Sequence, residues 1–595
     1  MKKIYSFVLM AAMLLVGTNV KATDVCSLKI GDAEAINYES LEEAFVAMDG
    51  TQNKTVVLTM LADATFDGTG LAKAPADGIQ ELQTENGYVF SGNDFTWDLK
   101  SFTVTNANWG RFRLHANNYT IKGDLDAQNH PLGAINFTDL KSNSQCGIYL
   151  YGETNEYSLV HTNLTIEKGV TISSMGYAIA VMANGTYAYN VKVDIYGTIT
   201  STGESAISIL GTVQGIPSQG NEAAAPTINI HDGASVTVPN DKAALYVAGY
   251  GNWVIEGTVE GGTGIYAKAG NITIQGNGTV TATAPEHTDA EPNGNGYTGG
   301  MGCAIIQDSK NGYAGGMTLV VTGNATLESQ ASDGYAIEEI KTDASQSKTE
   351  NITIVSGTLT GDIEMTGELQ EQVVLNGTIT GGTFSTDISE FLNPTAGALE
   401  LTASGYEVVE GCVSILNDYG LATFSSPNYN VVLPEDLNVW IVTGGLDGEG
   451  KLTLEKVVLS AGAILPEKTG FILEGTANKA FSFIKSTAAA TTGDLTANAL
   501  LSSDKFAAAA KPVYILHDTE LWLYEGIEFK EGKAFLPATL FGAGAPKRIQ
   551  MVFAETQAVE NVEVEAVKAE KFIENGQIFI IRGEKVYNVQ GQIVK

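Results

Sequence analysis

The sequence predicts an all-β protein made of a right-handed parallel β-helix, a β-sandwich and a short C-terminal β-hairpin segment. Three observations favour this fold class. A phrase of three short apolar runs, separated by glycine turns, returns many times between about residues 160 and 385. After about residue 410 the phrase stops, and alternating apolar and polar runs follow at the spacing of a sandwich. The last residues again contain short apolar runs around turns, as in a hairpin.

The repeated phrase contains three predicted strands in a fixed order. The first runs are Asn163–Ile166, Thr227–Ile230, Asn271–Ile274 and Asn351–Ile354. The second runs are Gly197–Thr200, Gly257–Glu260, Gly278–Thr281, Gly357–Thr360 and Gly377–Thr380. The third runs are Tyr177–Ile179, Ser205–Ile207, Gly264–Tyr266, Cys303–Ile305 and Tyr335–Ile337. Three strands per unit, stacked unit on unit, are typical of a parallel β-helix.

The distance between equivalent glycine turns varies along the coil. The excess lies in polar runs rich in glycine and proline, such as 284–294, which are predicted to protrude as loops. Asparagines at the strand starts, such as Asn271 and Asn351, are predicted to stack into side-chain ladders with a structural role.

The N-terminal part of the chain predicts an export signal followed by a helical cap. Residues 1–22 have lysines first, then an apolar stretch and a small residue suited to cleavage, as in a signal peptide. The coil is predicted over 23–410. It begins with a capping box, Ser40 to Glu43, which predicts a helix start. One face of that helix carries Leu41, Ala44, Phe45 and Met48.

Both ends of the predicted coil resemble a known family. The helix, the strand Thr55–Leu58 and the phrase Leu61–Asp63 resemble the opening of secreted pectin-lyase-like β-helix proteins. That resemblance implies that the helix plugs the end of the coil, so that no strand edge is left open. Residues Ile379–Ser385, with Gly405–Val408, resemble the last rung of many secreted bacterial β-helix proteins, which places the end of the coil near 410.

Residues 411–555 predict a β-sandwich, and 556–595 predict an acidic linker and a tail. The predicted strands are Ala422–Phe424, Val439–Val442, Leu452–Leu454, Gly470–Leu473, Val513–Leu516, Leu521–Tyr524 and Ala534–Leu536. Their order resembles an all-β module near the C-termini of surface proteins from Gram-negative anaerobes. The phrase Tyr587–Gly591 resembles the start of a type IX sorting signal, but the sequence stops at Lys595 before further strands. A structural β-hairpin is the alternative.

Charge and cysteine usage limit the classes of partner. The chain has 34 Lys and Arg against 68 Asp and Glu, a net charge of −34, which repels nucleic acid and anionic lipid. No stretch after residue 22 is long and apolar enough to be expected to span a bilayer. The four cysteines are far apart and form no Cys-x-x-Cys pair, so no metal site is expected.

One strand carries the candidate catalytic residues. Arg111, Arg113 and His115 share one face at period two, while Phe112 and Leu114 point the other way. The family resemblance implies enzymes that cut acidic polysaccharides with a basic residue and an acidic cluster, often around Ca²⁺. The carboxylates of that cluster would come from the next rung, from Asp124 and Asp126. The alternative is an ordinary solvent-facing strand.

Aromatic residues give the candidate binding positions. Trp109, Tyr250 and Trp253 lie near predicted rung ends or loops and could stack on sugar rings, although aromatic residues in such coils also pack inside. The coil lacks the paired Asp, Gly-His-Gly and Arg-Ile-Lys phrases of the pectinase-like hydrolases. The expected function is therefore an exported or cell-surface scaffold, adhesin-like or glycan-binding, without catalysis and without a cofactor. The alternative is a lyase or hydrolase acting on acidic glycans, and only this alternative calls for Ca²⁺.

Overall fold

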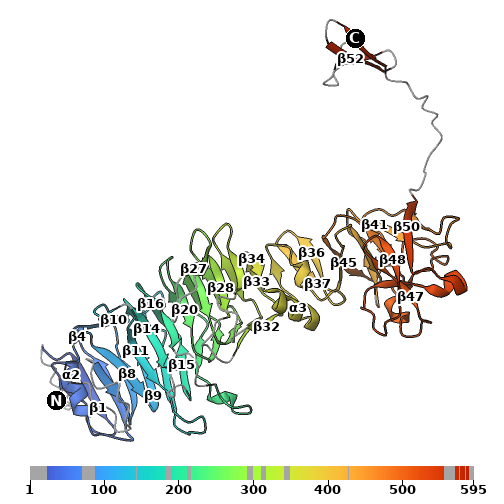
Figure 1. The fold of residues 1–595 in the computed structure, drawn as a ribbon. Coiled ribbons are helices and arrows are strands. Elements are labelled where there is room, and N and C mark those ends of the chain that lie inside the picture. Colours follow the sequence, from blue (N-terminus) through green and yellow to red (C-terminus); the bar gives the residue numbers. More distant parts are fainter. Residues whose placement is uncertain are drawn as a thin grey trace, which may run out of the picture.

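The computed structural model shows an elongated coil followed by a C-terminal group of sheets (Figure 1). It describes residues 23–69, 71, 87–142, 144–182, 189–210, 216–290, 299–309, 316–340, 349–426, 428–554, 570–574, 577–582 and 585–588. The predicted signal peptide, 1–22, the last residue of the predicted sandwich, 555, and residues 556–569 of the predicted linker lie outside these ranges.

Three sheets, almost entirely parallel, run along the coil. The first sheet has the order β2 (Ile36–Tyr38), β1 (Cys26–Ile30), β3 (Thr55–Met60), β6 (Asp94–Asp98), β9 (Asn117–Lys122), β12 (Thr162–Ile166), β15 (Val191–Ile195), β18 (Thr227–Ile230), β21 (Asn252–Ile255), β24 (Gly270–Ile274), β29 (Met317–Val321) and β32 (Thr349–Ile354). The second sheet has the order β36 (Ala398–Thr402), β37 (Gly405–Val409), β35 (Thr383–Phe384), β33 (Thr358–Thr360), β30 (Thr326–Ser329), β25 (Thr279–Ala282), β22 (Thr258–Gly261), β19 (Ser235–Thr237), β16 (Thr198–Ser201), β13 (Val170–Ser174), β10 (Gly133–Phe137), β7 (Thr103–Asn106) and β4 (Ala64–Phe66). The third sheet has the order β34 (Asp362–Glu364), β31 (Tyr335–Ile340), β28 (Cys303–Asp308), β23 (Thr263–Ala267), β20 (Ala243–Val247), β17 (Ile207–Leu210), β14 (Tyr177–Met182), β11 (Cys146–Tyr151), β8 (Arg111–His115) and β5 (Gly87–Phe90).

The predicted parallel β-helix is confirmed, and the repeated phrase explains it. With one exception, Gly377–Thr380, each predicted first run is a strand of the first sheet, each second run of the second sheet, and each third run of the third sheet. The register of the strands places apolar residues directly above apolar residues. For example, Ile166 pairs with Ile195, and Ile199 pairs with Val236. Alternate residues of each strand point inward, and the resulting stacks of Ile, Val and Leu form one continuous core.

Helix α2 (Leu41–Met48) closes the N-terminal end of the coil (Figure 1). The Ser40 hydroxyl accepts a hydrogen bond from the Glu43 backbone N–H, as the capping box predicts. The predicted apolar face is the buried face: Leu41, Ala44, Phe45 and Met48. The Phe45 ring contacts rings from all three sheets, including those of Phe66, Phe90 and Trp97.

The far end of the coil differs from the prediction. Helix α3 (Gly367–Asn376) was not expected, and the predicted run Gly377–Thr380 forms only an isolated bridge, Ile354 to Ile379. Gly377 ends the helix in a left-handed conformation, which glycine adopts at little cost. Parallel pairing stops at β35, because β37 and then β36 add to it in antiparallel fashion.

The C-terminal sheets begin where the coil stops. One sheet has the order β38 (Gly411–Ile415), β45 (Ala480–Ser486), β40 (Asn430–Val432) and β43 (Ile464–Leu465). The other has the order β39 (Leu421–Phe424), β44 (Phe471–Glu474), β41 (Asn438–Ile441), β42 (Leu452–Val457), β50 (Arg548–Ala554), β48 (Glu520–Tyr524), β47 (Val513–His517), β49 (Ala534–Pro537) and β46 (Leu501–Ser502). All seven predicted strands are present, and residues of both sheets share one apolar core. The arrangement of these sheets as a sandwich stays a prediction.

Short elements complete the described chain. The tail forms a three-stranded antiparallel sheet, β51 (Glu570–Glu574), β52 (Gln577–Arg582) and β53 (Lys585–Asn588), where the sequence predicts a hairpin. An antiparallel pair, β26 (Thr288–Ala290) and β27 (Gly299–Met301), projects from the coil. The 3-10 turns are η2 (Glu222–Ala224), η3 (Ser389–Phe391), η4 (Ser503–Lys505) and η5 (Ala538–Gly544).

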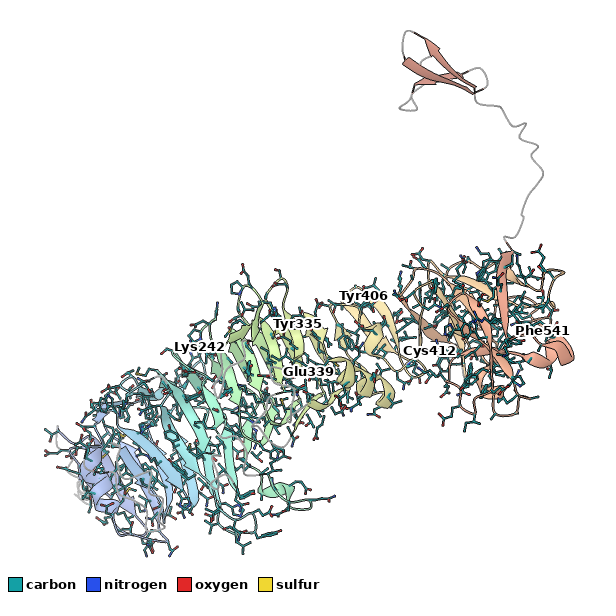
Figure 2. The ribbon with its side chains drawn as sticks, in the orientation of Figure 1. Lys242, Tyr335, Glu339, Tyr406, Cys412 and Phe541 are labelled. Atoms are coloured by element: carbon teal, nitrogen blue, oxygen red, sulfur yellow. The ribbon has the colours of Figure 1, made fainter. Side chains whose placement is uncertain are left out.

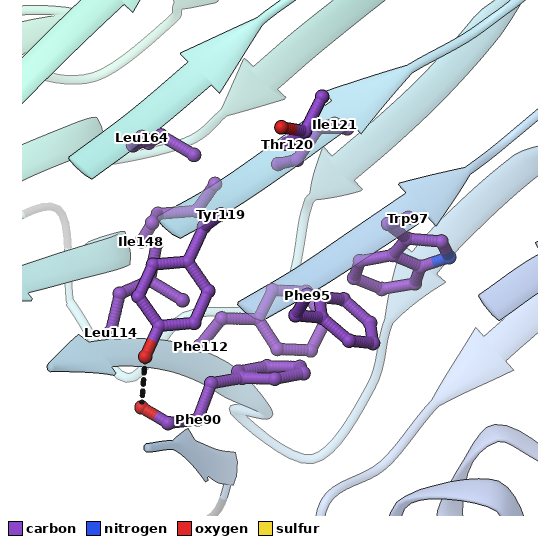
Figure 3. Close-up of a pocket in the computed structure, with 10 residues that line it drawn as sticks. All are labelled: Phe90, Phe95, Trp97, Phe112, Leu114, Tyr119, Thr120, Ile121, Ile148 and Leu164. Carbon is purple, nitrogen blue, oxygen red and sulfur yellow. Dashed lines mark hydrogen bonds between the residues drawn. The ribbon is translucent and has the colours of Figure 1, made fainter. Parts of the chain in front are cut away.

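The first rungs of the coil enclose a small apolar cavity (Figure 3). It has a volume of about 20 Å³, and Phe90, Phe95, Trp97 and Phe112 are among its lining residues. The Tyr119 hydroxyl donates to the Phe90 carbonyl at 2.8 Å, so this polar atom inside the core has a partner. The cavity has about the volume of one water molecule.

Candidate functional site

The candidate cationic face lies on the outer side of the third sheet. Phe112 and Leu114 point into the coil and line its cavity, while Arg111, Arg113 and His115 lie on the opposite face. That outer face is not open to solvent, because these three residues are exposed by only 2%, 1% and 7%. The alternative reading, an ordinary solvent-facing strand, is therefore wrong.

Tyrosines of the next rung cover the two arginines. The Arg111 guanidinium lies 5.3 Å from the centre of the Tyr149 ring, within reach of a cation–π interaction. Burial lowers the pKa of Arg113, and contact with the Tyr151 hydroxyl partly opposes that effect. His115 Nε2 lies 3.5 Å from Glu153 Oε1, a carboxylate that the sequence did not indicate.

The two predicted carboxylates lie elsewhere in the fold. Asp124 and Asp126 follow β9, in the turn that leads from the first sheet to the second. The Asp126 carboxylate accepts backbone N–H groups of Gln128 and His130 and lies 3.0 Å from His130 Nδ1. It therefore organises its own loop. Neither carboxylate is brought to the face of Arg111 and Arg113.

The three predicted aromatic positions differ in exposure. Trp253 is 1% exposed and packs inside the coil, so its ring offers no face to a sugar and this prediction is wrong. Trp109 is 45% exposed, and Lys141 Nζ lies 5.9 Å from its ring centre. Tyr250 is partly exposed, and its hydroxyl accepts a hydrogen bond from Asn271 Nδ2 at 3.2 Å.

Sequence reasoning missed a second polar group on the outer face of the third sheet. Lys268 Nζ lies 5.5 Å and 5.3 Å from the ring centres of Tyr246 and Tyr266. The Tyr266 hydroxyl donates to Asp308 Oδ2 at 2.7 Å. The Lys268 ammonium donates to the Tyr246 hydroxyl at 3.5 Å, so the two tyrosines have different polar partners. Lys268 and Asp308 are each only 1% exposed, so a polymer has no access to them in this structure.

The outer face of the first sheet is polar and half-exposed. One column of outward side chains follows the register from rung to rung: Asp94, Asn118, Asn163, Lys192, Thr227, Asn252, Asn271, Thr318 and Asn351.

Part of the column is a hydrogen-bonded ladder. Asn271 Nδ2 donates to Asn252 Oδ1 at 3.0 Å, and the Thr318 hydroxyl donates to Asn271 Oδ1 at 2.8 Å. The ladder predicted for Asn271 is confirmed, whereas Asn351 donates to Thr353 of its own strand.

No protein-family model, curated protein or solved structure matches this chain. No helix in the described part of the chain is long and apolar enough to cross a membrane. The geometry of the coil and the side chains on its three faces are therefore the features that bear on function.

Proposed function

We propose that this protein is an exported, adhesin-like scaffold of the cell surface that binds glycans without catalysis. One contrast supports the proposal. The charged groups that an acidic polysaccharide would need, such as Arg111 and Arg113, are buried on the third sheet, while the outer face of the first sheet presents amides and hydroxyls to solvent.

The first sheet suits a long, neutral ligand. Strands in a sheet are about 4.8 Å apart, so the column repeats similar donors and acceptors at a constant interval along the coil. Seven of the nine column residues carry amides or hydroxyls, which match sugar hydroxyls without adding charge, and the two charged members, Asp94 and Lys192, are of opposite sign. Tyr250 lies beside the column through its contact with Asn271 and adds an aromatic surface. The net charge of −34 disfavours acidic glycans, which makes neutral glycans the expected class.

The other parts of the chain fit a surface location under the same proposal. The apolar N-terminal segment 1–22 would direct export. The C-terminal sheets and the tail, whose sequence resembles a sorting signal, would attach or position the coil. The coil would then hold its polar face away from the attachment point.

Binding and cleavage can be tested together. The purified mature chain is incubated with neutral and acidic polysaccharides, with and without Ca²⁺, and retention and new chain ends are both measured. We expect retention on a neutral glycan and no products. Thr165→Arg and Thr273→Arg, on the outer face of the first sheet, should abolish retention, while Thr237→Arg and Thr258→Arg on the second sheet should not. The proposal is contradicted if the variants of both sheets lose retention equally, or if the wild-type chain is not retained on any glycan.

The alternative function, a lyase for acidic glycans, would use the basic and phenolic groups on the third sheet, which are buried in this structure. Such an enzyme would release unsaturated sugars in this assay. Arg111→Lys and Arg113→Lys keep the charge but lose the planar guanidinium, so a uronate-binding role predicts a large loss of product. The absence of any product from acidic glycans, with or without Ca²⁺, removes this alternative.

A further inference from the structure

Three metal-binding side chains from distant parts of the sequence meet on the outer side of the third sheet. They are His287, at the base of the projecting β26–β27 pair, Cys303, at the start of β28, and Glu338 of β31. Their donor atoms all lie within 4.8 Å of one another. Cys303 Sγ is 3.1 Å from Glu338 Oε2, and His287 Nε2 is 3.3 Å from Glu338 Oε1.

The coil places Cys303 and Glu338 on neighbouring rungs. Strand β28 pairs in parallel with β31, so that Cys303 is opposite Tyr335 and Ile306 is opposite Glu338. The thiol also lies within the outer apolar cluster that includes Tyr246 and Ile306. Both donors thus come from strands that the ladder holds rigidly, which favours a fixed site over a chance contact.

The projecting segment holds His287 against these strands. The His287 backbone N–H donates to Asp333 Oδ1 of the next rung at 3.0 Å. Its ring meets the Tyr335 ring edge to face, with centroids 4.9 Å apart (Tyr335 is labelled in Figure 2). Gly302 has a positive φ of 81°, and a Cβ there would come within 2.9 Å of His287 Cα. Glycine at this position therefore permits the close approach of the two chain segments.

The group is shielded from water. Cys303 is fully buried, Glu338 is 4% exposed, and the His287 side chain is 13% exposed. His287 Nε2 is itself buried and lies 3.3 Å from Glu338 Oε1, an ion-pair distance without hydrogen-bond geometry to any group that the structure describes. A cation bound between the two atoms would replace this contact with a bond to each of them.

The donor set points to one class of metal. A histidine nitrogen, a cysteine sulfur and a carboxylate oxygen together are typical ligands of Zn²⁺ and similar transition-metal dications. Calcium and magnesium prefer oxygen ligands only, so they do not fit. A thiolate and a carboxylate balance the two charges of the metal ion, and the neutral imidazole completes a neutral site.

We propose that His287, Cys303 and Glu338 bind one zinc-class dication and leave a fourth position for water or a small solute. On binding, the thiol proton of Cys303 leaves to solvent, together with any proton on Glu338, and the metal takes their place. The ion ties the base of the projecting pair to the next rung of the coil. This site is independent of the proposed glycan-binding face, which lies on the first sheet.

Cobalt(II) provides the most direct probe of the site. The mature, untagged chain is freed of metal with a chelator, kept reduced and titrated with Co²⁺. We expect one equivalent to bind, with thiolate-to-cobalt absorption in the near ultraviolet, tetrahedral bands in the visible and loss of both on adding Zn²⁺. Without a thiolate ligand the near-ultraviolet absorption cannot arise. If the wild-type chain does not show it, the proposal is wrong.

Variants separate a site from a chance contact. Cys303→Ser should abolish the near-ultraviolet absorption, while Cys412→Ser, at a buried cysteine of the C-terminal sheets (Figure 2), should keep it. His287→Ala and Glu338→Gln should weaken binding at least tenfold, because loss of a group that merely orients a ligand already costs about 10–100-fold. His287 is partly exposed, so its variant should fold even if Cys303→Ser does not. Unchanged affinity in His287→Ala overturns the assignment.

Discussion

Phe45 stacks on Tyr88 at the N-terminal end of the coil, with ring centroids 4.7 Å apart and an angle of 24° between the planes. The Tyr88 hydroxyl donates to the Phe45 carbonyl at 3.1 Å, so the two residues are joined through both ring and backbone. This contact fixes α2 over the open end of the coil. A cap held in this way shields the apolar core of the first rungs from water and from other chains.

Because Phe45 anchors the cap, we expect Phe45→Ala to lower the free energy of unfolding strongly. The ring is fully buried among aromatic residues of three sheets, so its loss leaves a cavity and should cost about 3–5 kcal/mol of unfolding free energy. The urea midpoint of the coil transition measures the effect. Val46→Ala, at the next and exposed position of the helix, is the control and should move the midpoint little. Similar shifts in both variants would show that α2 does not act as a cap.

At the junction between the coil and the C-terminal sheets, we expect Tyr429→Phe to lower stability less than Phe45→Ala does. The Tyr429 hydroxyl oxygen lies 2.6 Å from the Gly411 carbonyl oxygen and 3.1 Å from that of Thr395, and therefore links the two parts. Removing it should cost about 1 kcal/mol and make proteolytic cleavage between 395 and 411 about fivefold faster. Tyr419→Phe, at an exposed tyrosine, should leave the cleavage rate unchanged. An unchanged rate for Tyr429→Phe contradicts the predicted role of the hydroxyl.

Asp194 predicts a pH dependence of stability. Partial burial raises the pKa of Asp194, but hydrogen bonds from Lys192, His231 and Asn229 outweigh that effect, so its pKa lies below the usual value. A lowered pKa in the folded state means that the ionised carboxylate stabilises the fold. This stabilisation is fully present above the unfolded pKa of about 3.9 and is lost as the pH falls through the folded pKa.

Asp194→Asn therefore should be less stable than the wild type at pH 7, and the difference should vanish in strong acid. Urea midpoints measured from pH 7 down to pH 2.5 test this expectation. The exposed Asp232→Asn is the control, and its curve should run parallel to that of the wild type. A difference for Asp194→Asn that is the same at every pH would show that the substitution acts through packing and not through charge.

The coil was predictable because its sequence repeats the physical cause of the fold. Inward positions are apolar at period two, glycines mark the turns, and each of the three runs returns to the same sheet. Gly377–Thr380 has the same letters as the other second runs, yet it forms only a bridge. The helix before it, α3, lies between β34 and this bridge, and such a break depends on packing at the end of the coil more than on the local phrase.

The candidate sites were less predictable. Trp253 alternates with Asn252 and Val254 and pairs with Ile228 and Ile272, so period two alone indicates an inward ring. Strand periodicity likewise placed Arg111 and Arg113 on one face, but it could not show that this face is buried or that tyrosines of the next rung contact it. The burial of an outer face depends on neighbouring rungs, which differ in loop length.

The group of His287, Cys303 and Glu338 left no signal in the sequence. Cys303 and Glu338 are 35 positions apart, and a loop of irregular length carries His287. Standard metal-site patterns use short spacings within one segment, so they do not detect ligands from neighbouring rungs. The run 284–294 was predicted to protrude as a loop; residues 284–290 of it are described, and Thr288–Ala290 forms β26, which pairs with β27 in a sheet separate from those of the coil.

Gly302→Ala gives a test of how this group is held together, and the chain supplies a matched control. Gly302 and Gly233 both have a φ of 81°, so alanine enters the left-handed region at each position, at a cost of about 1–2 kcal/mol. The added Cβ at Gly302 comes within 2.9 Å of His287 Cα, whereas at Gly233 it meets no described atom within 4 Å.

Gly302→Ala should therefore lower the melting temperature more than Gly233→Ala does, and the excess measures the close approach. It should also push His287 away from Cys303 and Glu338, so that cobalt(II) affinity falls in Gly302→Ala and stays unchanged in Gly233→Ala. Equal melting temperatures in the two variants would show that the segment near His287 can move away from the new Cβ without loss of stability. The histidine would then be held by Asp333 and Tyr335 more than by the glycine contact.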